Sequence, residues 1–83
     1  MKKICYFVDT TDNHIDCVGV FEDNPDKEKV ASAINLEIAS MGFLDSYSDP
    51  EKVMEIGRSL AYTNYAQYGD YEFAIESVKE LKI

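Results

Sequence analysis

The residues of this 83-residue chain whose type and spacing best suit a chemical role are tyrosines. A tyrosine ring offers a large contact area at low entropic cost, and its hydroxyl is a polar tip, which suits a protein-binding surface. In the alternative interpretation the rings close the edge of a thin core and keep their hydroxyls in water. Base stacking normally needs a basic groove beside the rings, and none is evident. The residues at intervals of three are Tyr62, Tyr65, Tyr68 and Tyr71, with Tyr47 nearby.

Side chains that hold metals are few. The chain has two cysteines, Cys5 and Cys17, and one histidine, His14, whereas a structural zinc site takes about four such ligands. Acids gather around His14 without the fixed order of a calcium loop. In the predicted hairpin Asp9 lies opposite Asp16, and two carboxylates so close can raise the pKa of one of them. A solvated turn is nevertheless the ordinary origin of such an acidic cluster. The other acids of the cluster are Asp12, Glu22 and Asp23.

Nucleophilic and phosphate-binding motifs do not stand out either. Ser59 and Ser77 lack a glycine elbow, and a catalytic triad would need a second histidine. The four glycines are isolated, so no glycine-rich phosphate loop is indicated. We therefore expect no catalytic, metal-binding or cofactor-binding residues and no small-molecule substrate.

The net charge is −8, from sixteen acids and eight scattered bases, of which Arg58 is the one arginine. Phosphate binding relies on clustered Lys and Arg, so direct nucleic-acid binding is not expected. A basic protein partner suits this charge. The alternative is an acidic inhibitor that imitates DNA, of the anti-restriction or anti-CRISPR kind. Its carboxylates would be Glu72, Glu76 and Glu80, or Glu51 and Glu55.

The length allows one domain, residues 1–83. No apolar run approaches the roughly 18 residues of a membrane span, and the start does not resemble a signal peptide. We expect a cytoplasmic protein with free thiols.

The N-terminal segments predict a β-hairpin over residues 3–9 and 15–22, with a polar turn between them. A turn centred on residues 12 and 13 would place Cys5 and Cys17 on opposite faces, which argues against a disulfide. One set of side chains would then face the helices, and we expect it to be Ile4, Tyr6, Val8, Cys17 and Phe21; the alternatives are that the other set faces inward or that loops cover the outer set. The opposite set would be Cys5, Phe7, Val18 and Val20, which Ala74 and Val78 could extend into an apolar contact patch.

Two helices should follow. Asn24 and Pro25 suit the cap and first residue of one helix, which Gly42 would end. Asp49 and Pro50 suit the cap and first residue of a second helix in the same way, and Gly69 would end that helix. Gly57 inside that helix suggests a close approach of neighbouring backbone. The expected buried residues are Val30, Ala33, Ile34, Ile38 and Met41 in the first helix, and Val53, Ile56, Leu60 and Ala61 in the second.

Residues 71–81 fit either a strand or a helix. Strict alternation of Tyr71, Phe73 and Ile75 favours the strand. The resulting fold class is α+β, in the order ββααβ: two layers, with a three-stranded, mainly antiparallel sheet and two helices on one face. The last strand would run parallel to the first, and whether it pairs with the first or the second strand stays open.

Three short stretches resemble small uncharacterised bacterial and phage α+β domains. They are a Val18-Gly19-Val20-Phe21 strand end, a helix opening at residues 26–29, and a terminal strand at residues 73–78. The resemblance implies the hairpin, the helix that follows it and the terminal strand, but no site residues.

Together these observations predict a non-enzymatic, acidic protein-interaction or regulatory module. Its partner would be another protein or a second copy of the chain. The residues expected to bind this partner are Tyr62, Tyr65, Tyr68, Tyr71, Phe7, Val18 and Val20.

Overall fold

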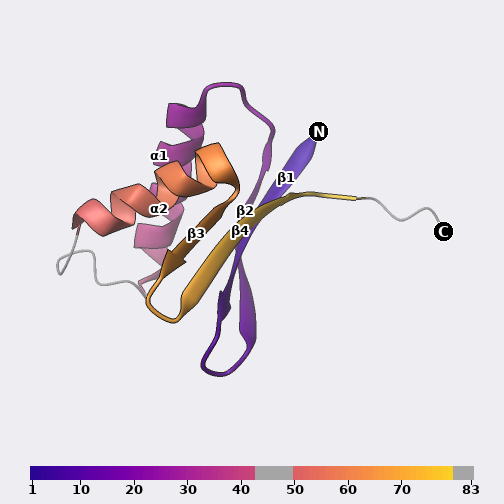
Figure 1. Cartoon of the computed structure of the whole chain (residues 1–83). Helices are drawn as coiled ribbons and strands as arrows, with labels where there is room; N and C mark the ends of the chain where they lie inside the picture. The colour runs from indigo at the N-terminus through magenta and orange to yellow at the C-terminus, as the bar shows by residue number, and fades with distance from the viewer. Residues whose placement is uncertain (43–49, 80–83) are drawn as a thin grey trace.

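The computed structural model describes residues 1–42 and 50–79 (Figure 1). Its chain begins with two antiparallel strands, β1 (Lys2–Asp9) and β2 (His14–Glu22). In the turn between them, Asp9 Oδ1 accepts a hydrogen bond from the Thr11 N–H at 3.0 Å. Asn13 has a left-handed φ of 59°, which asparagine tolerates better than most residues. The predicted hairpin and its polar turn are confirmed.

The register of this hairpin differs from the predicted one. Cys5 lies opposite Gly19, whereas Tyr6 lies opposite Cys17, so Val18 is an extra residue that forms a β-bulge in β2. A shift of one residue exchanges the two faces of a strand. The predicted inner and outer faces are accordingly wrong for most of the hairpin. Cys5, Phe7 and Val18 are buried, whereas Ile4, Tyr6, Val8 and Cys17 are half-buried or exposed.

Helix α1 (Lys27–Met41) begins two residues later than the predicted cap implies. Asp26 is the N-cap, and its side chain accepts the Lys29 N–H at 3.3 Å. Asn24 lies two residues before this cap, and its side-chain oxygen accepts a hydrogen bond from the Asp26 N–H at 2.8 Å. Gly42 ends the helix with a left-handed φ of 75°, as predicted. The buried residues are Ala31, Ile34 and Ile38, whereas Ala33 is exposed.

Helix α2 (Pro50–Thr63) buries the four residues predicted for it, and Pro50 is its first residue. Its end was predicted wrongly. The helix stops at Asn64, whose φ of 63° is left-handed and whose N–H donates to the Leu60 carbonyl at 2.9 Å. The chain then forms a short strand, β3 (Tyr65–Tyr68), where the sequence predicted a continuing helix. Asp49 and Tyr47 lie outside the described residues.

Gly69 is therefore a turn residue and not a helix end. It joins β3 to β4 (Tyr71–Ser77) in a tight hairpin, with Tyr68 opposite Tyr71. A positive φ at the first of two loop residues is the pattern of a type II′ turn, and Gly69 has a φ of 56°. The strand interpretation of the tail is confirmed for residues 71–77.

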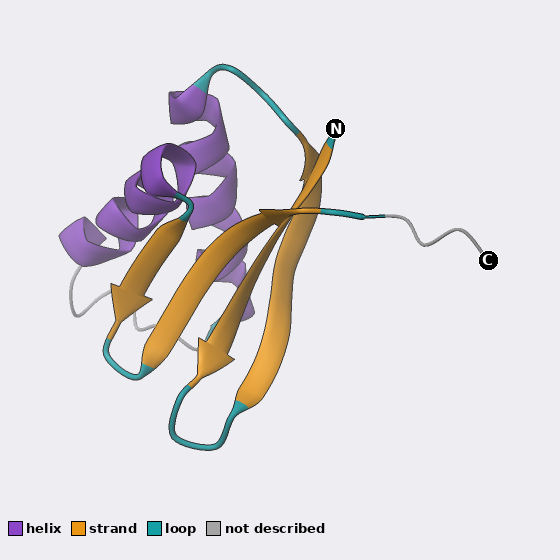
Figure 2. Cartoon of the chain, turned by 45° about the vertical axis from the view of Figure 1, so that its right-hand side comes forward, coloured by secondary structure: helices purple, strands orange, loops and turns teal. Residues whose placement is uncertain are grey.

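The sheet has four strands in the order β2-β1-β4-β3, and all three pairings are antiparallel. The additional strand β3 reverses the chain, so β4 runs antiparallel to β1 and not parallel to it. Both helices lie on one face of this sheet, which confirms the predicted two-layer α+β arrangement (Figure 2). None of the helices in the described residues is both long and apolar enough to cross a membrane.

The core lies between the helices and the inner face of the sheet. Its most deeply buried large side chains are Phe73 from β4, Ile38 from α1, Leu60 from α2 and Cys5 from β1. Phe7 packs on Phe73 with ring centroids 5.5 Å apart. The centre of the sheet therefore supplies the aromatic part of the core, and each helix contributes aliphatic residues from one stripe.

Candidate interaction surface

The sheet face that points away from the helices carries apolar side chains, and their placement follows from the register of the strands. Tyr6 lies near its centre, between Cys17 on β2 and Ala74 on β4, and Tyr65 on β3 lies beyond Ala74. Partners in antiparallel strands share a face, so the neighbouring rows follow from the same register. We name this surface the outer sheet face; it consists of Ile4, Tyr6, Val8, Ile15, Cys17, Val20, Tyr65 and Ala74.

These side chains remain accessible in the described part of the chain. Ile15 is 64% exposed, Val20 55% and Tyr65 47%, and Cys17 is also exposed. Ile4, Tyr6, Val8 and Ala74 are half-buried by their neighbours on the sheet. An antiparallel sheet with one solvated face normally alternates apolar and polar residues. Here both faces of β1 are apolar, and a contiguous apolar surface of this kind is typical of a binding site.

Two carboxylates of β4 lie among the apolar residues of the outer sheet face, beside two tyrosines. Glu72 lies opposite Val8, and its Oε1 accepts a hydrogen bond from the Tyr65 hydroxyl at 3.4 Å. Glu76 lies opposite Ile4. Burial, and secondarily the charge of Glu76 and a hydrogen bond to it, raise the pKa of Tyr6. The rings of Tyr6 and Tyr65 thus lie on an apolar surface while their hydroxyls interact with carboxylates, and aromatic residues of this kind are enriched in protein interfaces.

On a continuing helix Tyr62, Tyr65 and Tyr68 would form one oblique stripe, but these three rings and Tyr71 occupy three different places. Tyr62 is exposed on α2, and its hydroxyl donates to Glu28 Oε1 at 3.1 Å. Tyr65 belongs to the outer sheet face. Tyr68 and Tyr71 are half-buried against the core, and the Tyr71 ring meets Phe7 edge-on at 5.8 Å. A helix end and a hairpin separate these rings, so the helical stripe does not exist.

The other predicted contact residues divide in a similar way. Val20 lies on the outer sheet face as expected. Phe7 and Val18 are only 5% and 8% exposed, so the expectation that they face away from the helices is wrong. Phe7 pairs with Phe73 in the middle of the sheet, and the bulge turns Val18 inward. Val78, which we expected to extend the patch, follows the last residue of β4 and is exposed.

The residues of the outer sheet face that the sequence did not predict as contact residues are Ile4, Tyr6, Val8, Ile15 and Cys17. Alternation within β1 does not distinguish its faces, because both are apolar. The distinguishing signal lies in β4, where Phe73 and Ile75 were correctly assigned to one face. Cys5 pairs with Ile75 and Phe7 with Phe73 in the structure. The pairing of β4 with β1 would therefore have identified the buried set.

The acidic hairpin turn is solvated and internally bonded. Asp9 lies opposite His14 and not opposite Asp16. Hydrogen bonds from the Thr11 hydroxyl and N–H lower the pKa of Asp9, contrary to the rise considered for a carboxyl pair. Within the described residues, no group of three or more His, Cys, Asp or Glu side chains is placed to hold a metal ion.

The cysteines are both free, and they differ in environment. Cys17 is exposed on the outer sheet face, whereas Cys5 is buried in the core. Burial, assisted by the nearby Cys17, raises the pKa of Cys5 to about 12, so its thiol stays protonated at neutral pH. The two cysteines lie on opposite faces of the sheet, as predicted, and Cys5 is a packing residue.

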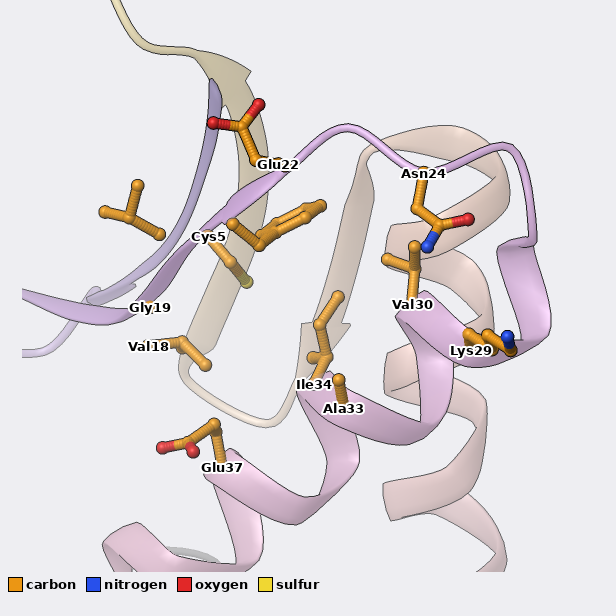
Figure 3. Close-up of a pocket in the computed structure, with 12 residues that line it drawn as sticks. Cys5, Val18, Gly19, Glu22, Asn24, Lys29, Val30, Ala33, Ile34 and Glu37 are labelled. Atoms are coloured by element: carbon orange, nitrogen blue, oxygen red, sulfur yellow. The ribbon is translucent and has the colours of Figure 1, made fainter. Parts of the chain in front are cut away.

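A concave feature lies on the inner side of β2, between this strand and α1. We name it the β2–α1 groove; its volume is about 580 Å³. Its walls include Val18 and Phe21 from β2 and Val30 and Ala33 from α1. Figure 3 shows Glu22 and Glu37 at opposite ends of the groove, with apolar side chains between them.

The carboxylates considered for DNA imitation do not form an unbroken row. Glu51 and Glu55 are exposed on α2, where Lys52 and Arg58 interrupt them, and Arg58 lies 3.8 Å from Glu28. Glu72 and Glu76 lie among apolar residues of the outer sheet face, and Glu80 falls outside the described residues.

Neither a family model, nor a curated protein, nor a solved structure matches this chain.

Proposed function

We propose that this chain is a non-enzymatic protein-interaction module that binds another protein through its outer sheet face. The observation behind the proposal is that face itself. It exposes Ile15 and Val20 on β2 and Tyr65 on β3, although the same sheet buries its other face under two helices (Figure 2). Transfer of apolar surface from water stabilises a complex by about 25 cal/mol per Å². A partner of matching shape that covers this face would therefore gain binding free energy from the exposed apolar side chains.

The features around the face support a protein partner. Tyrosine is enriched in protein interfaces, and the face has a central and a peripheral tyrosine, Tyr6 and Tyr65. The surrounding carboxylates and the net charge of −8 favour a partner with basic residues at its rim. The apolar side chains at the centre of the face also distinguish this proposal from DNA imitation, in which an array of carboxylates would form the contact surface.

Site-specific photo-crosslinking tests the proposal. A benzophenone side chain would replace Tyr65 on the outer sheet face or, as controls, Leu36 on α1 and Met54 on α2, which are 73% and 55% exposed. In the cells that make the protein, we expect a discrete cross-linked product from position 65 and none from the controls. The triple variant Ile15→Thr, Val20→Thr and Tyr65→Thr keeps strand-forming residues and should abolish the interaction without unfolding the domain.

Equal cross-linking from all three positions, or none from position 65, would contradict the assignment. A product that contains a nucleic-acid enzyme, resists the triple variant and disappears when Glu72 and Glu76 become glutamine would instead support the DNA-mimic alternative.

A further inference from the structure

Strand β2 is an edge of the sheet, and part of its main chain has no pairing partner among the described residues. The Lys2 carbonyl accepts the Val78 N–H at 2.9 Å, so the main chain of Lys2 points toward the β4 side. The residue opposite Lys2 in β2 is Glu22, and two residues further Ile4 lies opposite Val20. In an antiparallel ladder the pairs alternate. Val20 and Glu22 therefore direct their N–H and C=O groups away from β1, toward the free edge.

The lower half of the same edge is blocked. The β-bulge at Val18 interrupts the regular ladder, and the Cys17 N–H is taken by the Asp16 carboxylate at 2.8 Å. Bulges and inward-turned charges are devices that protect an edge from pairing. The open stretch of edge is consequently short, from Gly19 to Glu22.

The β2–α1 groove lies beside this open stretch. Gly19, Val20, Phe21 and Glu22 all line it, and Val30 and Ala33 of α1 form the opposite wall. Gly19 leaves the groove open, because a Cβ at this position would meet no heavy atom within 4 Å. Side chains of an added strand would alternate between this groove and the outer sheet face, so one residue in two would enter an apolar space.

We propose that β2 binds an extended segment of a partner protein, which adds as a fifth strand at Val20 and Glu22. The segment places an apolar side chain over Gly19 and basic side chains near Glu22 and Glu37. Main-chain hydrogen bonds provide affinity in this mode, and the groove provides selectivity. Glu22 at one end of the groove lies 3.5 Å from the N-terminal amino group, whereas Glu37 at the other end is exposed; Glu37 and the net charge of −8 favour a basic segment. The proposal concerns a surface different from the centre of the outer sheet face and does not depend on the function proposed for that face.

A synthetic peptide tests the proposal on the full chain. The probe is a fluorescein-labelled Lys-Lys-Val-Thr-Val-Thr-Val-Lys-Lys peptide, with a control in which glutamate replaces every lysine. We expect the basic peptide to bind with a Kd below about 1 mM. In ¹H–¹⁵N spectra, the amides of Val20 and Glu22 should shift most. Binding should weaken as salt rises, because exposed charges are screened.

Three variants distinguish binding in the groove from nonspecific attraction between the basic peptide and the acidic protein. Gly19→Val fills the groove without a left-handed backbone angle to strain it, and should keep the thermal midpoint while weakening binding by at least about 10-fold. Glu37→Lys should weaken binding of the basic peptide and favour the acidic one. Glu55→Lys, the same charge change on α2 away from the groove, should have little effect.

Four results would overturn the proposal. They are no binding at about 1 mM peptide, unchanged binding to folded Gly19→Val, equal effects of Glu37→Lys and Glu55→Lys, or a dimer of the unmodified protein that Gly19→Val dissociates. The last would make a second copy the occupant of the groove. The outer-face variant Tyr65→Thr should leave peptide binding unchanged, so this test and that of the proposed function fail independently.

Discussion

The side chain of Asn35 on α1 contacts the backbone of α2 at Gly57, where the two helices approach closely. Asn35 Oδ1 accepts the Gly57 N–H at 3.1 Å, and its Nδ2 donates to the Met54 carbonyl at 3.4 Å. A Cβ at Gly57 would collide with Asn35 and lie 2.6 Å from the Ala31 carbonyl oxygen. The glycine inside α2 is thus explained by the approach of α1, as its place in the sequence suggested.

Gly57→Ala should destabilise the domain although alanine is the better helix former. Overpacking against backbone costs up to about 3 kcal/mol, and the gain in helix propensity is about 1 kcal/mol. We expect a net loss of about 1–2 kcal/mol, which lowers the midpoint by roughly 4–8 °C per kcal/mol in thermal unfolding. Glu55→Ala on the exposed side of α2 is the control and should change stability by less than about 0.5 kcal/mol. Equal stability of the two variants would contradict the close approach.

The two faces of the hairpin should respond differently to substitution. Phe7→Ala removes a ring from the core and should cost about 3–5 kcal/mol. Ile15→Thr on the outer sheet face should change the free energy of unfolding by about 0.5 kcal/mol or less. Urea unfolding of the two variants measures the difference. A larger loss of stability from Ile15→Thr than from Phe7→Ala would contradict the burial of Phe7.

Asn64 should prefer glycine to alanine, because its backbone is left-handed. Asn64→Ala should destabilise the end of α2 by about 1–2 kcal/mol, whereas Asn64→Gly should be neutral or slightly stabilising. Thermal unfolding followed by circular dichroism distinguishes the pair. If alanine is as well tolerated as glycine, then α2 continues past residue 64 and β3 is not formed as described.

The two thiols should differ in reactivity. In the folded protein at pH 8, a disulfide reagent should modify Cys17 quickly and Cys5 only after unfolding, because burial keeps the Cys5 thiol protonated. The folded pKa of Cys5, about 12, exceeds the usual value of an unfolded cysteine, about 8.5. The folded state therefore retains a proton that the unfolded state loses, and stability should fall as pH rises above about 9. Rapid reaction of both thiols in folded protein would contradict the burial of Cys5.

The hairpin turn should titrate at low pH through Asp9. The Thr11 hydrogen bonds lower the folded pKa of Asp9 below its unfolded value, about 3.9, so their stabilisation is present above that pH. It is lost as the pH falls through the folded pKa. Thr11→Val removes the hydroxyl donor, and carboxyl chemical shifts should then show the Asp9 pKa moving up toward its usual value. An unchanged pKa would exclude the hydroxyl as the cause.

Local signals were sufficient for much of the fold. The hairpin, the stop at Gly42 and the buried stripe of α2 each depend on residues close together in sequence. The tail was recognised as a strand because Tyr71, Phe73 and Ile75 alternate, and β4 buries Phe73 and Ile75. Turn residues, caps and periodicity act over a few positions, so they can be recognised without knowledge of distant partners.

The missed strand β3 shows where local signals conflict. Tyrosines at intervals of three fit a helix that continues to Gly69, and this pattern conflicts with the helix end at Asn64. The tight Gly69 turn between Tyr68 and Tyr71 was the contrary signal, since a short glycine-containing link between β-forming residues is typical of a hairpin. Four residues are too few to show alternation clearly.

The faces of the sheet could not be predicted because they depend on distant pairing. One extra residue at Val18 changes the register of β2, and no local feature of Val18 distinguishes it from its neighbours. The candidate site inherited this error, so Phe7 and Val18 were expected outside and Tyr6 inside. Only the pairing of β1 with β4, more than sixty positions away, separates the two sets.

The bulge at Val18 also limits how the molecule can aggregate. A flat, regular edge can recruit copy after copy of the same strand and grow into a fibril. The kink leaves too short a stretch of β2 for such stacking, while the opposite margin of the sheet, β3, is only four residues long. The domain can therefore expose apolar surface on its sheet and still resist polymerisation through its strands.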